Sequence, residues 1–518
     1  MTAISEKTKE SFIDSYPEFE KACHAFFRQE LAPNIYKGIS GKFGSYAERG
    51  AKSGMIRLRF PGGRITRDQI HYLSTAMQQH DLQYVHFTTG QTIQFHHLSG
   101  ETILTMYKEC FDHGIYCIGG GGDNPRNVTA SPLRGIDPKE YFDISPYVNA
   151  ASDYALTLIP QLHLPRKYKI GFSNGTDNEG HATFKDLGFL AKENGLFDVY
   201  AAGGLGAGNP RLGLKVGENV EPKDILYYVD AFGQIFMAYG DYEHRAKARS
   251  RFMPTHLGDK EFHTIFQTYL AESRKKDLDI TPEYTKITKE GSAAAASPEN
   301  PRIHPQRQSG LYYAEYHPIA GTPDRTVFFK VLQFLTHTEG TEIRLNTDET
   351  MYIINLTIQE AEEIARLTQS DAAANAFEKS VCCIGASICQ QGLRDSHGML
   401  TRLVHQLRKD GVLTDVLPQI HISGCPSSCG THQIGSLGFR GAAKKTAAGM
   451  KPAFAVFTGG AYKATQESLG EQAGVITEDA IPAFLTALCH VLEDSGQSFT
   501  DWHAGHAEEF TVLLSQFE

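Results

Sequence analysis

The chain has 518 residues, of which 41% are hydrophobic and 21% charged, and its formal net charge is −10. This length exceeds what one core supports, so we expect several domains in a globular protein. The acidic balance, without a long run of one sign, argues against nucleic acid or an anionic membrane as the main partner. No window reaches the run of about 18 apolar residues that a membrane span needs, and the polar N-terminus lacks the apolar core of a leader, so we expect a cytoplasmic protein.

Residues 51–145 predict a compact α+β unit that follows an N-terminal arm over residues 1–50. The apolar pattern indicates a strand, a turn at Pro61 to Gly63, an amphipathic helix from about Thr66, and two strands that meet near Gly90. A larger αβ unit is predicted next, and a stretch rich in Ala, Ser and Pro then indicates a linker. The larger unit and the linker cover residues 146–285 and 286–310.

The second half of the chain repeats this order of elements. Thr89 to Thr92 correspond to Thr347 to Thr350, 258 positions later, and the LGF triplet at Leu187 recurs at Leu437, 250 positions later. Two copies are too few for a solenoid. We therefore expect an α/β (α+β) protein with an internally duplicated, pseudo-twofold architecture and a site between its halves. The repeated small and large units cover residues 311–372 and 373–518.

Four cysteines in the second half form two close pairs. Cys383 and Cys389 are separated by five residues, and Cys425 and Cys429 by three. If folding joins the pairs, they can present four thiolates to an iron–sulfur cluster or to zinc, although structural zinc sites favour closer pairs. Coincidental buried thiols are the remaining explanation. The other five cysteines are scattered and indicate no disulfide framework.

Cationic residues stand at separated places in this acidic chain. Arg57 and Arg59 lie two apart on a predicted strand, as do Lys167 and Lys169 in LPRKYKIG, and Arg126 lies in GDNPRN. Residues two apart on a strand face the same side, so each pair points together. Taken alone, such pairs are also typical of a solvated face.

The order of six motifs resembles the sirohaem-containing sulfite and nitrite reductases over nearly the whole chain. The motifs are RLRFPGG, TTGQTIQFH, NPRN, LPRKYK, the Cys-x5-Cys pair and GCPSSCG. The resemblance implies two small ferredoxin-like halves packed together plus two larger αβ domains, with sirohaem and a [4Fe–4S] cluster as cofactors. It also implies that four cysteines bind the cluster and that the last one bridges to the sirohaem iron: Cys383, Cys389, Cys425 and Cys429.

The resemblance also assigns roles to basic and polar residues. In relatives, cations line the distal face and contact the anion, which gives catalytic roles to Arg57, Arg126, Lys167 and Lys169. Lysine can donate protons and arginine cannot, so we expect the lysines to supply protons and the arginines to hold the anion. Sirohaem carries many carboxylates, so basic and polar groups are expected around its rim. The predicted rim residues are Arg59, Thr88, Gln91, Gln94, His96, Arg245 and Arg249, with the last two on one helix face.

Three positions bear on the substrate and on details of the site. Gly90 stands where relatives commonly have Arg, and Asn124 stands where some members have a cysteine cross-linked to a tyrosine. Lys169 is Asn in typical plant nitrite reductases, so its presence favours sulfite slightly.

We therefore predict six-electron reduction of sulfite to sulfide. Nitrite reduction to ammonia with the same cofactors is the alternative, and a non-catalytic four-cysteine metal scaffold is an alternative of another class. The sequence has no convincing flavin or nicotinamide segment, so electrons are expected from a flavoprotein subunit or ferredoxin.

Overall fold

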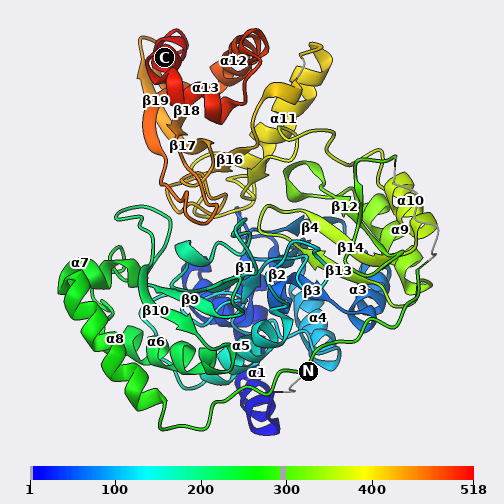
Figure 1. Ribbon diagram of the computed structural model, residues 1–518, viewed down its shortest axis with the longest axis vertical. Coiled ribbons are helices and arrows are strands. Elements are labelled where there is room, and N and C mark those ends of the chain that lie inside the picture. Colours follow the sequence, from blue (N-terminus) through cyan, green and yellow to red (C-terminus); the bar gives the residue numbers. More distant parts are fainter. Residues whose placement is uncertain (1–3, 292–298, 413) are drawn as a thin grey trace.

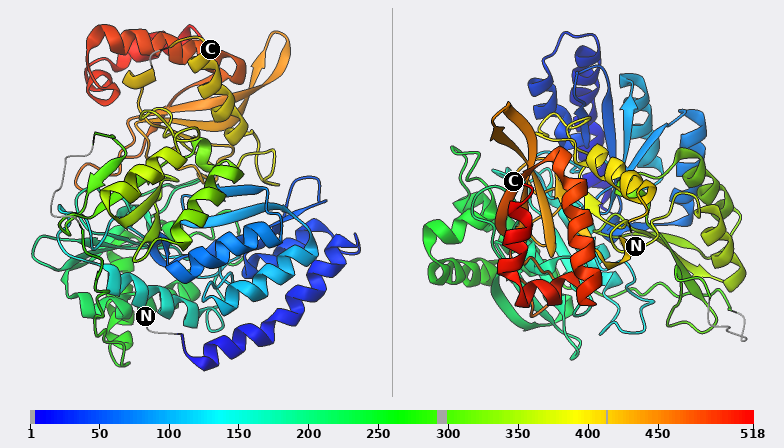
Figure 2. Two further views of the ribbon diagram at one scale, coloured as in Figure 1. Left: turned by 90° about the vertical axis from the view of Figure 1, so that its right-hand side faces the viewer. Right: turned by 90° about the horizontal axis from the view of Figure 1, so that it is seen from above.

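The computed structural model describes residues 4–291, 299–412 and 414–518. Four sheets organise the chain, two in small units and two in larger ones. Figure 1 shows the C-terminal unit, yellow to red, standing above the other three, and the two further views in Figure 2 show the same arrangement. Residues 292–298 of the predicted linker lie outside the described residues. Among the described residues, no helix combines the length and apolar character needed to cross a membrane.

The first small unit is built on a four-stranded antiparallel sheet of order β1-β2-β5-β4. Helix α3 begins after Thr66, which forms a capping box with Gln69, so the predicted helix start is confirmed. The predicted turn is a single 3-10 turn over Pro61–Gly63. The elements are β1 (Ser45–Ala47), β2 (Gly54–Arg59), β3 (Arg64–Ile65), α3 (Arg67–Gln79), β4 (Tyr84–Phe87), β5 (Thr92–Leu98) and α4 (Gly100–Asp112).

The second small unit has the same succession of strand, turn, helix, two strands and helix. Its sheet has the order β11-β12-β14-β13-β3, so the last strand comes from the first unit. The two units share one hydrophobic core, and α3 packs against α9. Its own elements are β11 (Ile303–Pro305), β12 (Tyr312–Tyr316), α9 (Arg325–Thr336), β13 (Glu342–Leu345), β14 (Met351–Leu356) and α10 (Ile358–Leu367).

Strand β3 ties the small units together. It pairs antiparallel with β13, with Arg64 opposite Arg344 and Ile65 opposite Ile343. Glu342 accepts hydrogen bonds from both arginines, including one of 3.0 Å from Arg64 Nε and one of 2.8 Å from Arg344 Nη2. Burial would raise the pKa of the Glu342 carboxyl, but the charges and hydrogen bonds of Arg344 and Arg64 lower it to about 2.

The two larger units also match each other. Each has a five-stranded sheet whose first three strands are parallel and whose last two are antiparallel to their neighbours. The first contains β6 (Thr129–Ala130), α5 (Ser145–Leu158), β7 (Ile170–Ser173), β8 (Leu187–Ala191), β9 (Phe197–Ala201), β10 (Leu214–Val220), α6 (Ile225–Tyr239), α7 (Met253–Leu257) and α8 (Asp259–Ser273).

The second larger unit follows the same plan. It contains β15 (Val381–Cys382), α11 (Ser396–Lys409), β16 (Ile420–Ser423), β17 (Leu437–Thr446), β18 (Gly449–Thr458), β19 (Glu471–Thr477), α12 (Ile481–Ser495), α13 (Phe499–Gly505) and α14 (Ala507–Ser515). Helices α1 (Glu6–Phe27) and α2 (Pro33–Ser40) precede the first sheet. Each larger unit has its own hydrophobic core.

Unusual backbone conformations recur at the predicted repeat spacings. His97 and Asn355, 258 positions apart, both have φ of 61°. Asn178 and Ser428, 250 positions apart, have φ of 48° and 54°. Non-glycine residues rarely adopt positive φ, so paired occurrences at matching positions indicate a shared backbone plan. The predicted α/β class with duplicated architecture is confirmed.

Candidate functional site

One cavity of about 360 Å³ brings together most of the predicted site. Its walls come from the first small unit, from the segment that precedes β7, and from the loops that follow β15 and β16. All four predicted cluster cysteines line it. So do the four predicted catalytic cations, Arg57, Arg126, Lys167 and Lys169.

The thiols are placed by two loops that leave neighbouring parallel strands. Cys383 directly follows β15, and Cys425 lies just beyond the end of β16. The backbone N–H of Gly424 donates to Cys383 Sγ at 3.2 Å, and Ser396 Oγ lies 3.1 Å from the same sulfur. Burial raises the pKa of Cys383 to about 12. A bound cation would reverse that preference, because metals bind the thiolate.

The four thiols line one cavity. Within the described residues, no three His, Cys, Asp or Glu side chains are arranged to hold a single metal ion. A tetrahedral zinc site requires such convergence, with all sulfurs near 2.3 Å from one ion. Four thiols lining a shared cavity suit a larger inorganic cluster better.

The two predicted arginines are tied to the glycine run at residues 119–122. Arg57 Nη1 donates to the Gly120 carbonyl at 2.6 Å, and Arg126 donates to the Gly122 carbonyl through Nε and Nη2 at 3.1 and 2.9 Å. A Cβ on Gly121 would lie 2.2 Å from the Tyr46 hydroxyl and 2.4 Å from a backbone oxygen, so only glycine fits there. The run therefore fixes both guanidinium groups at the cavity wall.

Lys167 and Lys169 reach the cavity from an extended segment just before β7. Tyr168 between them is fully buried, so the alternation predicted for this segment is present. No ion pair or hydrogen bond engages either ammonium group among the described residues. Burial lowers the pKa of Lys167 well below its usual range, with nearby Lys169 acting in the same direction. Burial, followed by Arg249, lowers the pKa of Lys169 to about 8.

Three predicted rim residues, Thr88, Gln94 and His96, line the cavity. His96 Nδ1 lies 2.8 Å from Glu48 Oε1. With its amide oxygen turned toward Arg57, Gln94 accepts from Arg57 Nε at 2.9 Å and donates to His96 Nε2 at 3.0 Å. These side chains therefore form a chain of hydrogen bonds that orients Arg57.

Two other predicted rim residues lie elsewhere. Arg59 is buried behind the cavity wall and donates to the carbonyls of Ile118 at 2.8 Å and Arg126 at 3.1 Å. Gln91 is fully buried and donates to the carbonyls of Ala130 and Leu345 at 2.6 and 2.7 Å. Both side chains donate to backbone carbonyls, and neither residue lines the cavity, so their contact with a cofactor stays a prediction.

The predicted helix face with Arg245 and Arg249 is wrong. The segment HRAKARSRF forms turns that lead into a short 3-10 helix over Ser250–Phe252. Arg245 is exposed and pairs with Asp123 at 2.8 Å, whereas buried Arg249 pairs with Asp186 at 3.1 Å. Neither residue lines the cavity.

Several cavity residues were not predicted from the sequence. Tyr46, on β1, presents its hydroxyl to the N–H of Gly122 at 2.8 Å. Lys37 lies at the wall from α2, and Lys185 from the segment before β8. None of these belongs to a motif. Tyr46 lies opposite Met55 in the β1–β2 hairpin, and the central carbon of the Arg57 guanidinium lies 6.0 Å from the centre of the Tyr46 ring.

The cavity has a marked excess of positive groups. Among the described residues, only two carboxylates line it, Glu48 and Glu349. Glu48 is engaged by His96 and by Ser53, while burial raises the pKa of Glu349 well above its usual value, which favours its neutral form. A polyanionic ligand would compensate this charge. The lining cations are Lys37, Arg57, Arg126, Lys167, Lys169 and Lys185.

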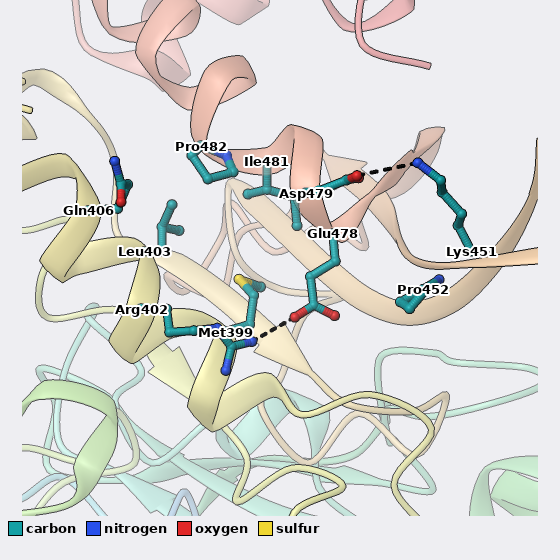
Figure 3. Close-up of a pocket in the computed structure, with 10 residues that line it drawn as sticks. All are labelled: Met399, Arg402, Leu403, Gln406, Lys451, Pro452, Glu478, Asp479, Ile481 and Pro482. Carbon is teal, nitrogen blue, oxygen red and sulfur yellow. Dashed lines mark hydrogen bonds and ion pairs between the residues drawn. The ribbon is translucent and has the colours of Figure 1, made fainter.

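A larger cavity of about 580 Å³ lies in the C-terminal unit, near α11 and the start of α12 (Figure 3). None of the described residues that line it carries a thiol, and its cations are paired: Arg402 with Glu478 at 2.7 Å and Lys451 with Asp479 at 3.4 Å. Both pairs are visible in Figure 3. Because its charges are internally compensated, this cavity does not compete as the reactive site.

Comparison with known proteins identifies two domains. Residues 121–274 match the nitrite and sulphite reductase 4Fe-4S domain, and residues 46–110 match the nitrite/sulfite reductase ferredoxin-like half domain. The chain is 27% identical over 448 residues to a ferredoxin–nitrite reductase of Synechococcus elongatus, covering 82% of this chain and 83% of that protein. It is 24% identical over 491 residues to sulfite reductase [ferredoxin] 1 of Mycolicibacterium paratuberculosis, covering 89% and 83%.

A solved structure has the same fold. The Mycobacterium tuberculosis NirA protein superimposes with a TM-score of 0.77 at 20% identity, over 93% of this chain and 92% of that one. The two domain matches, the relatives and the duplicated fold agree with one another. Two parts of the chain are therefore similar to the domains of the nitrite and sulfite reductase 4Fe-4S family, and the chain as a whole has the fold of the NirA protein.

Proposed function

We propose that this protein reduces sulfite to sulfide by six electrons. The observation that carries the proposal is that four thiols and six cations line one cavity. The thiols suit a [4Fe–4S] cluster, and the cations suit both a macrocycle with several carboxylates and a small anionic substrate. The residues present therefore fit sirohaem next to a cluster.

The proposed cluster ligands are Cys383, Cys389, Cys425 and Cys429, with Cys429 shared with the sirohaem iron. Cys429 is the most exposed of the four thiols, and Thr89 Oγ1 donates to its carbonyl at 2.9 Å. This hydrogen bond links the cysteine loop to the turn between β4 and β5. When bound, the coupled cofactors would supply electrons to the anion one at a time.

The protein's own groups hold the anion and move protons. Arg57 and Arg126 are fixed by the glycine run and by Gln94, so they require little reorganisation when negative charge develops on the anion's oxygens. Lys167 and Lys169 have ammonium groups that make no other bond in the described chain, which leaves them available to donate protons to leaving oxygens. Arginine does not lose its proton under these conditions, so the division of roles follows from side-chain chemistry.

Nitrite reduction to ammonia is the second candidate. It is favoured by the relative from Synechococcus elongatus, whose name describes a ferredoxin–nitrite reductase. Nitrite also needs six electrons and a cationic pocket, so the same cavity suits it. We propose ferredoxin as the electron donor, because relatives of both substrate types carry ferredoxin in their names.

Visible spectra and rates test the proposal. The purified protein should contain iron, absorb as a chlorin-type haem, and change its spectrum when sulfite or nitrite is added. Steady-state rates with each anion under one reduced ferredoxin then identify the substrate. A large preference for nitrite would overturn the sulfite assignment, whereas zinc in place of iron without chlorin absorption would overturn the reductase proposal.

A further inference from the structure

Lys185 is a cavity cation that the family motifs do not contain. It lies two residues before β8 and is only 8% exposed, yet it lines the cavity. Among the described residues, its ammonium group has neither a hydrogen bond nor an ion pair. A lysine buried this deeply is normally paired, because an uncompensated charge is costly to bury.

The path of Lys185 into the cavity depends on a glycine in the neighbouring strand. A Cβ on Gly171, in β7, would lie 2.8 Å from Lys185 Cγ and 3.1 Å from its Cε. The aliphatic part of Lys185 therefore occupies the space that a side chain at Gly171 would fill. This packing directs the ammonium group past β7 and toward the cavity.

The second half of the protein solves the same packing problem in the opposite way. The positions equivalent to Gly171 and Lys185, 250 residues later, are His421 and Gly435. There the glycine is on the other side of the pair, and its missing Cβ would lie 2.7 Å from the His421 ring. His421 Nδ1 is occupied by Thr431 Oγ1 at 2.7 Å. Of the two equivalent positions, only that of the first half holds a lysine, Lys185, which packs over Gly171 and has no partner among the described residues.

The charged groups around Lys185 leave it without a counter-ion. Lys169 and Arg249 repel it, and buried His181 lies close enough for Lys185 to lower its pKa. Asp186 is the adjacent carboxylate, but it already accepts from the N–H of Lys169 at 2.8 Å and from Arg249 at 3.1 Å. Burial, followed by the charge of Lys169, lowers the pKa of Lys185 to about 7.

We propose that Lys185 binds an anionic oxygen inside the cavity, as a further substrate-site or cofactor-site cation. The inference rests on the proposed function and adds a residue to it. The oxygen belongs either to the small substrate anion or to a carboxylate of the macrocycle. Both sources present the same chemistry to an ammonium group, and the experiment below separates them.

The test measures anion binding by the oxidised holoprotein, without turnover. Nitrite is the probe, because it stays a monoanion throughout the neutral range, and its dissociation constant is read from the change in visible absorption between pH 6 and 8.5. Macrocycle content per chain is measured on the same samples. Three variants are compared with the wild type: Lys185→Met, Lys185→Arg, and Lys260→Met as a control for an exposed lysine on α8.

If Lys185 contacts the substrate, Lys185→Met should weaken nitrite binding at pH 6 by about tenfold, the loss expected for one charge-assisted hydrogen bond. Wild-type affinity should fall as the pH rises through about 7, because the charged form of Lys185 then disappears. Lys185→Arg should keep the nitrite affinity and lose the decrease near pH 7. A decrease in affinity near pH 8 should persist in this variant, because it would come from deprotonation of Lys169. Lys260→Met should match the wild type.

If Lys185 contacts the macrocycle instead, Lys185→Met should lower macrocycle content and Lys185→Arg should restore it, with unchanged nitrite affinity in the loaded fraction. The inference is overturned if Lys185→Met changes neither quantity while the wild type binds nitrite normally. A wild type without chlorin absorption or without any response to anions contradicts the proposed function itself, so the two failures are distinguishable.

Discussion

The two halves of this protein place opposite charges on the same backbone plan. Arg57 in β2 pairs in register with Gln94, and Glu315 in β12 pairs with Tyr352, each residue 258 positions beyond its counterpart. Arg57 faces the cavity, whereas Glu315 is engaged by Lys379 and lies 3.8 Å from His304. The fold therefore supplies two equivalent positions, and only the one that carries the arginine lines the cavity.

The cysteine loop shows the same contrast. Glu179 stands 250 positions before Cys429, in a turn with matching positive-φ residues on either side. Burial and nearby Asp348 raise the pKa of Glu179 to about 8, so this position favours a protonated acid in place of a metal-binding thiolate. The cavity therefore takes its arginine from the first half and its thiol from the second, and the equivalent position in the other half is an acid in both cases.

The largest effect should come from Cys429→Ser. If Cys429 is the bridge that we propose, its loss should abolish nearly all of the proposed reductase activity and uncouple the haem and cluster spectra, because serine is a poor iron ligand. Electron paramagnetic resonance and iron content provide the measurement. Glu179→Gln is the matched variant in the other half and should retain both signals. Normal turnover by Cys429→Ser would contradict the bridge.

Arg57→Gln should lower kcat/KM by about 10²–10³-fold, as expected when one fixed donor to a developing anion is removed. Steady-state kinetics with saturating donor measure this loss. The counterpart, Glu315→Gln, should leave kcat/KM close to that of the wild type. Equal kinetic losses in the two variants would show that position in the fold, and not charge, matters.

Glu315→Gln should instead affect stability in a pH-dependent way. His304 and Lys379 lower the pKa of Glu315 to about 2 against the effect of burial. A carboxyl with a depressed pKa stabilises the fold above its unfolded value of about 4.5 and loses that contribution as the pH falls toward 2. The melting temperatures of wild type and variant should therefore differ at pH 7 and converge in acid.

Lys169→Asn should reduce kcat for sulfite by about 10²-fold with little change in macrocycle content, because its proposed task is proton delivery. Lys445→Asn, an exposed lysine of β17, is the matched control and should behave as wild type. Unchanged sulfite kinetics in Lys169→Asn would remove this lysine from the catalytic set.

The smallest effect should come from Gly90→Arg. Gly90 lines the cavity. A Cβ added at Gly90 would lie 3.6 Å from its nearest neighbouring atom, Thr88 Oγ1, so a side chain is accommodated. An added guanidinium should slow macrocycle loss by about tenfold through one charge-assisted hydrogen bond. Absorbance decay during dialysis measures it, with Gly90→Ala as the uncharged control. Equal decay in both variants would exclude a carboxylate near this position.

The sequence was sufficient for the architecture and for most of the cavity. Helix caps and apolar periodicity are local, so the capped start of α3 and the repeated order of elements could be predicted. Motif order also placed the four cysteines and four cations on one cavity. These features depend on residues close together in the chain or on a resemblance that spans it.

Depth and long-range packing were not predictable in this way. The alternation of side chains predicts which face of a strand a residue occupies, but not how far along the strand the cavity extends. Arg57 and Arg59 share a predicted face, yet of the two only Arg57 lines the cavity. The spacing of Arg245 and Arg249 predicts a shared helix face, but the segment forms turns in which Arg249 pairs with buried Asp186 and Arg245 with partly exposed Asp123. Lys185 depends on a glycine in another strand, and no local pattern reveals that dependence.

Strand β3 has a consequence for how the chain can be divided. Two residues donated by the first half complete the sheet of the second, so a fragment ending at the linker would lack β13 as a partner. The complementary fragment would expose β13 as an open edge, and open edges recruit other chains. During synthesis, β3 can therefore pair with β13 only after the second half of the chain has been made. The duplicated protein is thus one cooperative unit and not two independently folding domains.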